Sequence, residues 1–223
     1  MGKIKHFSAL IPLVLIVLLS LSCTAIKEDR PPISNPYGGR APYGTGEHAG
    51  IDYDIRRGTP IIASADGVVE RVTDHPGERE SHSGGYYVFI RHDSEVYIRY
   101  YSQYAHLSKV FVSCGHTVKR GQVIGLSGES YNGNQHLHFG LLKRAGGGRW
   151  IHNTYNPNTW GLNGEKPECF DPKKDYSQYP SNVITLPIPC REYRKILRNF
   201  DPKQDYSQYS SDVITLPIPC WDR

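Results

Sequence analysis

The segment HLHFGL, residues 136–141, sets two histidines at alternate positions of an apolar run. Successive side chains of a strand point to opposite faces, so residues two apart share a face. We therefore expect His136 and His138 to lie on one face, and Leu137 and Phe139 to point into a core. Two neutral imidazoles side by side suit a metal site or an acid–base pair.

A second polar segment, GEHAGIDYDI (46–55), supplies possible partners for these imidazoles. His48 and Asp52 are four residues apart, with Gly50 between them. A straight strand would separate them by about 13 Å, whereas ligands of one zinc ion each lie about 2 Å from it. Either a helical turn brings positions i and i+4 together, or the chain bends at Gly50, which tolerates unusual dihedrals. The β-branched residues around the glycine favour the bend.

A third segment, YAHLSKV (104–110), places His106 after a Tyr-rich run and before a polar turn. Two imidazoles and a carboxylate would leave the fourth tetrahedral position open, as a catalytic zinc requires. Zinc polarises a carbonyl group and lowers the pKa of a bound water molecule. Two further imidazoles could then move protons or hold a developing oxyanion. The remaining histidines outside the N-terminal segment lack such a context and are interpreted as surface residues: His75, His82, His92, His116 and His152.

The elements that must position these groups are strands. From about Tyr37 to Trp160, short runs rich in Val, Ile and Tyr alternate with glycine-containing turns, and none shows a sustained helical period. This spacing predicts an antiparallel all-β domain.

The blocks HAGIDYDIRRGTPIIASADGVVERV, YAHLSKVFVSCGHTVKRGQVIGLSGES and HLHFGL follow one another in this order. Together they resemble the lysostaphin/LytM-type zinc endopeptidases, bacterial enzymes that cut peptide cross-links of peptidoglycan. The resemblance spans roughly Tyr43 to Leu142. It implies a two-sheet antiparallel β core with the zinc in a groove.

By position, the resemblance makes His48, Asp52 and His138 the ligands of one zinc ion per chain. It makes His106 and His136 the catalytic pair. The implied chemistry is metal-assisted amide hydrolysis, in which zinc-activated water attacks the scissile carbonyl and one of the two histidines protonates the leaving amine. Which histidine does so is left open.

The N-terminus reads as a targeting segment. Residues 1–23 combine a basic start with fifteen mostly apolar residues, which is short for a spanning helix and typical of a signal peptide; a retained membrane anchor is the other reading. The run ends in LSLSC, which resembles a lipoprotein signal and would place a lipid on Cys23. We expect an exported protein of the bacterial cell envelope, in the periplasm or anchored to a membrane. Residues 24–40 are polar and Pro-rich and are predicted to be a linker.

The metalloendopeptidase core is predicted over residues 41–162, followed by a tail, 163–223. Within the tail, FDPKKDYSQYPSNVITLPIPC (170–190) returns as FDPKQDYSQYSSDVITLPIPC (200–220). The repeat is interpreted as a duplicated appendage or as a small wall- or partner-binding module. Cysteines of an exported chain suggest disulfides, so Cys169 and Cys190 are expected to pair, which leaves Cys220 to pair with Cys114 or to stay free.

Three other functions compete with the endopeptidase. One is a catalytically silent binding module that activates another wall hydrolase, although none of the five site residues is missing. Another is a cupin-type metal site, which needs a carboxylate shortly after the second histidine, whereas the next acid is Glu165. The third is a structural zinc, which usually has four protein ligands. A net charge of +4 without a basic cluster argues against nucleic-acid binding.

Overall fold

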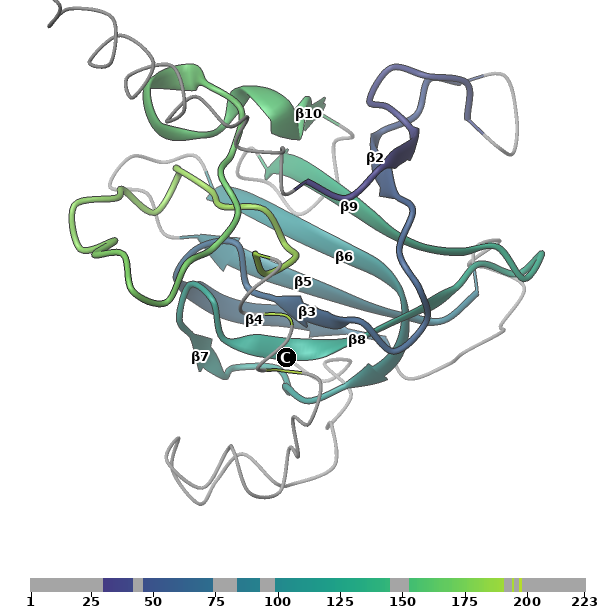
Figure 1. The fold of residues 1–223 in the computed structure, drawn as a ribbon, viewed down its shortest axis with the longest axis horizontal. Helices are drawn as coiled ribbons and strands as arrows, with labels where there is room; N and C mark the ends of the chain where they lie inside the picture. Colours follow the sequence, from purple (N-terminus) through teal and green to yellow (C-terminus); the bar gives the residue numbers. More distant parts are fainter. Residues whose placement is uncertain are drawn as a thin grey trace, which may run out of the picture.

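The computed structural model describes residues 30–41, 46–73, 84–92, 99–144 and 153–190, together with Arg194 and Leu197 (Figure 1). Within these ranges the regular elements are ten strands and two 3₁₀ helices: β1 (Ile33–Asn35), β2 (Gly50–Tyr53), β3 (Pro60–Ile62), β4 (Gly67–Val72), β5 (Tyr86–His92), β6 (Arg99–Val110), β7 (Thr117–Val118), β8 (Val123–Glu129), β9 (Gln135–Arg144), β10 (Asn153–Tyr155), η1 (Pro157–Thr159) and η2 (Leu162–Gly164). The strands pair antiparallel throughout. The all-β, antiparallel prediction is therefore confirmed.

Among the described residues there is no helix whose length and apolar character would let it cross a bilayer.

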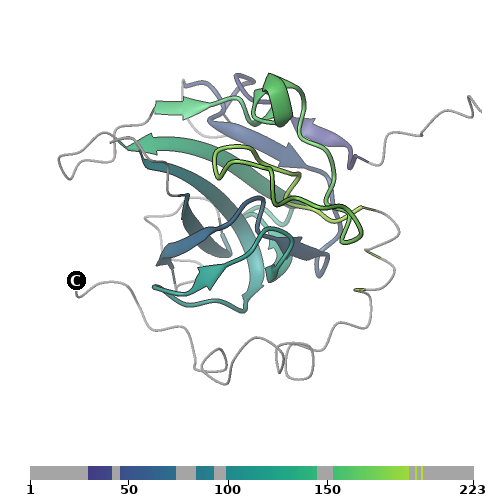
Figure 2. The same ribbon diagram turned by 90° about the vertical axis from the view of Figure 1, so that its left-hand side faces the viewer.

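The sheet runs in the order β1-β2-β9-β8-β6-β5-β4-β7, so strand β9 is third from one end and has paired neighbours on both edges (Figures 1 and 2). One edge of β9 pairs with β2 and then with β10. Its other edge pairs with β8 near its start and with β6 along the rest. The strand that carries the H-x-H motif is thus fixed on both sides.

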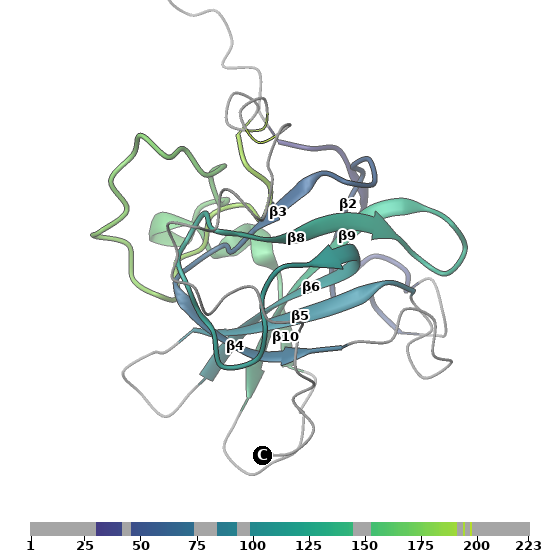
Figure 3. The ribbon, with the colours of Figure 1, turned by 90° about the horizontal axis from the view of Figure 1, so that it is seen from below.

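Strand β6 changes partner at His106. Residues 99–105 pair with β9, and residues 107–110 pair with β8. Between the two segments His106 has a φ of 61°, in the left-handed region that non-glycine residues rarely occupy. Viewed from below, β3 and β8 lie on one side of this arrangement and β5 and β4 on the other (Figure 3). His106 therefore lies at the junction where β6 leaves β9 and begins to pair with β8.

The alternation predicted for β9 is confirmed. Leu137 and Phe139 are both fully buried in the main apolar core, whereas His136 and His138 on the opposite face are half-buried. The hydrophobic effect therefore fixes which face of β9 carries the imidazoles, because a shift by one residue would move both apolar side chains out of the core.

The interpretation of His92 as a surface residue is wrong. It is 2% exposed, donates from Nδ1 to the carbonyl oxygen of Asp66 at 2.7 Å, and contacts Ser102 Oγ through Nε2 at 2.8 Å. A buried imidazole needs such partners, and a sequence motif does not reveal them. His116 is half-buried and accepts a hydrogen bond from the Ser113 backbone N–H at 3.2 Å. Three further histidines lie outside the described residues: His75, His82 and His152.

Part of the expected linker belongs to the sheet. β1 pairs with β2 along Ile33↔Tyr53 and Asn35↔Asp52. Close by, the Tyr37 hydroxyl donates to the Thr154 carbonyl at 2.8 Å. Residues 24–29 of that linker, like the targeting segment and Cys23, lie outside the described residues.

The first copy of the tail repeat packs on the core. Ile184, Leu186 and Ile188 are each 1–2% exposed, and the segment crosses the sheet face in Figures 1 and 2. The Cys169–Cys190 disulfide, expected from the sequence, is present with a Cα–Cα distance of 5.1 Å. The second copy, with Cys220, lies outside the described residues. The first copy is therefore part of the folded domain, beyond the predicted core boundary.

Arg120 holds this tail segment in place. Its guanidinium donates to the carbonyl oxygens of Ser64 at 2.8 Å and Val183 at 2.7 Å. It also lies 5.6 Å from the ring centroid of Tyr176 and 5.2 Å from that of Tyr179. The arginine thus joins the core to the tail by hydrogen bonds and cation–π contacts.

Gly50 does not act as the predicted bend. β2 begins at Gly50, so His48 precedes the strand, and Gly50 is not among the positive-φ glycines. What it provides is close approach: a Cβ there would lie 2.6 Å from the Phe139 carbonyl oxygen and 2.8 Å from His138 Nε2. The missing side chain lets β2 and the His138 ring meet.

We expect Leu186→Ala to lower the free energy of unfolding by about 2–5 kcal/mol, because it empties a fully buried position. Leu162, which is 43% exposed, provides the control: Leu162→Ala should change stability by no more than about 0.5 kcal/mol. Urea unfolding followed by tryptophan fluorescence measures both. Equal effects of the two substitutions would show that the tail segment contributes nothing to the core.

Gly50→Ala should destabilise the protein by about 1–3 kcal/mol, since the new methyl group overpacks against β9 and the His138 ring. A Cβ at Gly46 would have no atom of the described residues within 4 Å, and its φ is not positive, so Gly46→Ala is the matched control. Calorimetric melting of both variants checks this prediction. A Gly50→Ala variant as stable as Gly46→Ala would contradict the close-approach role.

Candidate metal centre

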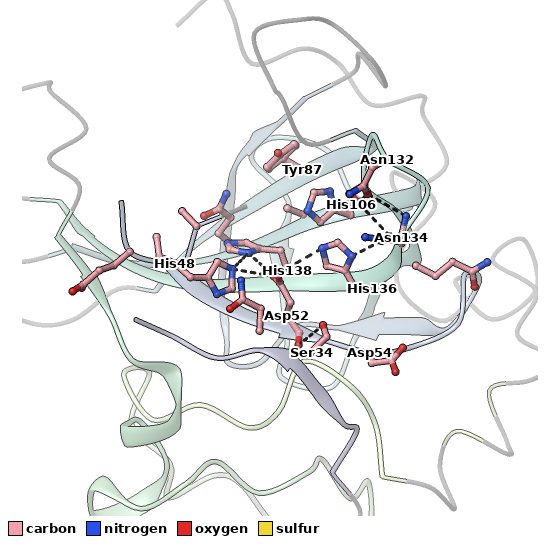
Figure 4. Close-up of a pocket in the computed structure, with 18 residues that line it drawn as sticks. Ser34, His48, Asp52, Asp54, Tyr87, His106, Asn132, Asn134, His136 and His138 are labelled. Atoms are coloured by element: carbon pink, nitrogen blue, oxygen red, sulfur yellow. Dashed lines mark hydrogen bonds and ion pairs between the residues drawn. The ribbon is translucent and has the colours of Figure 1, made fainter. Parts of the chain in front are cut away.

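A groove of about 860 Å³ crosses one face of the sheet. Its walls come from β1, β2, β5, β6 and β9 and from the hairpin between β8 and β9 (Figure 4). All five sequence-predicted site residues line it: His48, Asp52, His106, His136 and His138. Among the described residues that line it are Glu47, Asp52 and Asp54 but no Lys or Arg, so this part of the lining is electronegative.

Three of these side chains bring their donor atoms to one point. His48 Nε2 lies 3.1 Å from Asp52 Oδ1 and 3.0 Å from His138 Nδ1, and the last two atoms are 2.9 Å apart. Donor atoms of a tetrahedral zinc site, each about 2.0–2.1 Å from the ion, are about 3.3 Å from one another. Three donors at nearly this spacing form a group able to hold a metal ion.

Strand register explains how two of the donors meet. Asp52 on β2 is the direct cross-strand partner of His138 on β9, and paired residues of neighbouring strands have side chains within contact distance. His48 reaches them from the loop before β2, where its backbone N–H donates to the Gly39 carbonyl at 2.7 Å. The loop and the strand pair together create the H-x-x-x-D geometry.

The backbone orients the His48 ring for binding. Its Nδ1 lies 3.0 Å from the Pro36 carbonyl oxygen. A carbonyl can only accept, so Nδ1 carries a proton. When the ring is neutral, Nε2 carries a lone pair that points to the space shared with Asp52 and His138 and can bind a metal ion. A second hydrogen bond that fixes the tautomer is usual for metal-binding histidines. The donor set and its orientation therefore fit zinc.

The charge of Asp52 dominates the electrostatics of the cluster. Burial raises the pKa of its carboxyl group, but hydrogen bonds from His138 and His48 outweigh burial and hold the pKa well below its ordinary value. Burial by itself lowers the pKa of His48. The hydrogen bond to Asp52 and the negative charge of its carboxylate raise this pKa by more, so the net shift is upward. Without a metal ion, this carboxylate therefore favours positive charge on His48; a divalent cation can take that role.

His106 and His136 form a second pair beside the cluster, with ring centroids 4.5 Å apart (Figure 4). His106 Nδ1 donates to the Gly84 carbonyl at 3.0 Å, and His136 Nδ1 donates to the Asn134 carbonyl at 3.0 Å. Each neutral ring is thus left with a lone pair on Nε2. Burial lowers the pKa of His106 to about 4, and the neighbouring imidazoles of His136 and His138 contribute in the same direction.

Some residues that shape the site were missed from the sequence. The carbonyl oxygens of Pro36, Gly84 and Asn134 orient the imidazoles, and no sequence signal marks a carbonyl, because every residue has one. Tyr87 also lines the groove. In the run GYYVFIRH, strand alternation predicts that Tyr87 and Val88 point to opposite faces of the strand. This pattern alone does not show that the face of Tyr87 lines a groove.

Residues 46–152 match the model of Peptidase family M23. Over 93 residues, the chain is 43% identical to an uncharacterized metalloprotease of Haemophilus influenzae, covering 41% of this chain and 18% of that protein. Over 99 residues it is 41% identical to the peptidoglycan DD-endopeptidase ShyA of Vibrio cholerae, covering 44% of this chain and 21% of that protein. A solved structure, the catalytic domain of a mutant of the prophage-encoded M23 protein EnpA from Enterococcus faecalis, is similar at 29% identity with a TM-score of 0.44, covering 59% of this chain and 97% of that one.

The matched part of this chain covers about a fifth of the length of the two curated relatives. The similarity therefore concerns one domain of those proteins. The range of this chain that matches the family model includes all five residues gathered in the groove, since His48 and His138 both lie inside it. Residues 46–152, just under half of the chain, therefore resemble a domain of Peptidase family M23, and the relatives similar to this chain include a peptidoglycan DD-endopeptidase.

Proposed function

We propose that this protein is a zinc-dependent endopeptidase that hydrolyses peptide cross-links of bacterial peptidoglycan. The observation that carries the proposal is the convergence of His48 Nε2, Asp52 Oδ1 and His138 Nδ1 within 3.1 Å of one another in an open groove. ShyA, to which this chain is similar, is a peptidoglycan DD-endopeptidase. The alternative, a silent module that activates another hydrolase, would need no such set of donors.

His48, Asp52 and His138 would hold the zinc ion. Three protein ligands are the usual number for a catalytic zinc, because the fourth position must stay open to water or substrate. Bound there, zinc supplies a Lewis acid that polarises the scissile carbonyl group and makes water more acidic. The Asp52 carboxylate would reduce the net positive charge of the site.

His106 and His136 would handle hydrogen bonds and protons around the scissile amide. His106, with its pKa lowered to about 4, stays neutral at physiological pH, so its Nε2 accepts a hydrogen bond and orients the attacking water. His136 Nε2 lies 3.9 Å from Asp52 Oδ1, so a protonated His136 would be paired with a carboxylate. We assign the delivery of a proton to the leaving amine to His136 on this basis.

A peptidoglycan substrate requires the protein to act in the cell envelope, and we therefore propose that location. The apolar segment of residues 1–23 supports export, and the LSLSC sequence supports a lipid on Cys23. Radiolabelled palmitate incorporated into the wild type but not into Cys23→Ser would support the anchor; equal labelling of both, or labelling of neither, would contradict it.

His138→Ala should lose zinc and hydrolytic activity together, because it removes a ligand, whereas His136→Ala should keep zinc and lose turnover by about 10²–10⁴-fold, the usual contribution of a general acid or base. Metal analysis of dialysed protein and chromatography of muropeptides released from purified peptidoglycan give the two readouts. A His138→Ala variant with full zinc would refute the ligand assignment. Wild-type protein that binds zinc but releases no muropeptide, with a chelator-treated sample as control, would favour the silent module.

His106 makes the metal-free protein less stable in acid. Its pKa is about 4 when folded and about 6.5 when unfolded, so between these values only the unfolded state binds the proton. The free energy of unfolding therefore falls as pH drops from about 6.5 to about 4, by up to about 3 kcal/mol from this group, and its contribution is constant outside that window. His106→Asn, which suits the left-handed backbone at this position, should remove this part of the slope. Chemical unfolding of both chelator-treated proteins at a series of pH values measures it, and identical slopes would contradict the assignment.

A further inference from the structure

The floor of the groove is one face of five neighbouring strands. In spatial order, it presents Ser34 from β1, Asp52 from β2, His138 and His136 from β9, His106 from β6 and Tyr87 from β5. Neighbouring strands are about 4.8 Å apart. The floor therefore extends well beyond the metal cluster toward β5, and Tyr87 is the described lining residue farthest from the cluster on that side.

Tyr87 reaches this floor because β5 alternates. Val88 and Ile90 are fully buried on the core face, so Tyr87 points to the groove face. β5 is irregular opposite the β6 junction, where the register shifts between Tyr86 and Val88. The Tyr87 ring lies 6.2 Å from the His106 ring, centroid to centroid, and Figure 4 shows it next to His106 on the groove wall.

The Tyr87 hydroxyl has unused hydrogen-bonding capacity. Within the part of the chain that the structure describes, the Tyr87 backbone N–H donates to Thr73 Oγ1 and its carbonyl oxygen accepts from the Thr73 backbone N–H, whereas its hydroxyl makes no hydrogen bond. Burial raises the pKa of Tyr87 to about 12, so the phenol keeps its proton at any physiological pH. A neutral O–H donor on a largely buried ring, facing a groove, suits a carbonyl oxygen of a bound ligand.

We propose that Tyr87 is a substrate-binding residue that fixes the peptide chain beyond the scissile amide, on the His106 side, by donating its hydroxyl proton to a substrate carbonyl oxygen. The inference rests on the proposed endopeptidase function. β9 and β5 are two strand spacings apart, about 10 Å, which an extended peptide covers in about three residues. Tyr87 therefore contacts a residue two or three positions from the cleaved bond, and recognition depends on substrate length.

Tyr87→Phe tests this assignment, because it removes only the hydroxyl. Tyr131→Phe is the matched control: this tyrosine is 78% exposed and does not line the groove. Two substrates are compared, a cross-linked muropeptide dimer and a minimal peptide that ends one residue to either side of the scissile amide. Zinc content and melting temperature are recorded for each variant to show that the site and the fold are intact.

For the dimer, Tyr87→Phe should lower kcat/KM by about 2- to 12-fold, as expected for one hydrogen bond, mainly through a higher KM. For the minimal peptide it should change nothing, and Tyr131→Phe should change neither value. An equal loss on both substrates would place Tyr87 in the chemical step or in the fold, and no loss on either would remove it from recognition; both results overturn the proposal.

Calorimetric titration with a dimer analogue whose scissile amide is reduced to a methylene amine separates this inference from the proposed function. If wild-type protein binds the analogue but cleaves no substrate, the endopeptidase proposal fails. The Tyr87 proposal is still decided in that case: a Kd raised about 2- to 12-fold in Tyr87→Phe supports it, and an unchanged Kd overturns it. Wild-type protein that does not bind the analogue overturns both.

Discussion

A carboxylate held between two imidazoles is the interaction on which the site depends. Asp52 is 7% exposed, and burial of an unpaired carboxylate is strongly unfavourable. His48 and His138 both lie within 3.1 Å of the same carboxylate oxygen. The cluster thus needs positive charge, supplied by protonated imidazoles or by a divalent cation. The same requirement suits the arrangement to a divalent metal ion, since a cation balances the carboxylate while both imidazoles act as neutral ligands.

The sheet supplies the precision that this cluster needs. Direct pairing of Asp52 with His138 fixes two donors on rigid strands, and Gly50 allows the strands to meet without a clash. The third donor and the second histidine pair depend on irregular backbone. His48 is oriented by the Pro36 carbonyl, and His106 sits at the left-handed residue where β6 changes partner. Strained backbone at such a position is characteristic of functional sites, where the surrounding structure must compensate for it.

The tail contributes to this framework at a distance from the groove. Its first repeat copy places three aliphatic side chains in the core and is closed by the Cys169–Cys190 disulfide. Ser64, which accepts bonds from Arg120 and from the Thr185 backbone N–H, also contacts the buried Tyr104 hydroxyl at 2.9 Å. Tyr104 lies two residues before His106, so the tail is packed against the strand that carries this histidine. A role of the tail in supporting the domain follows directly from these contacts.

Periodicity and residue type in the sequence were sufficient to predict the class of fold and the face of β9 that bears the imidazoles, because alternation along a strand is a local property. The five residues of the site were also named from their motifs and from a family resemblance. Tertiary structure decided what depends on contacts between distant segments. It assigned Gly50 to close packing in place of a bend, buried His92 in a polar network, and included β1 and the first tail repeat in the folded domain. It also supplied the carbonyl oxygens of Pro36 and Gly84 that set the histidine tautomers. These features depend on which backbone atoms come together in three dimensions. The sequence does not show which backbone carbonyl will orient a histidine, or which glycine will allow close packing, because both depend on contacts with distant residues.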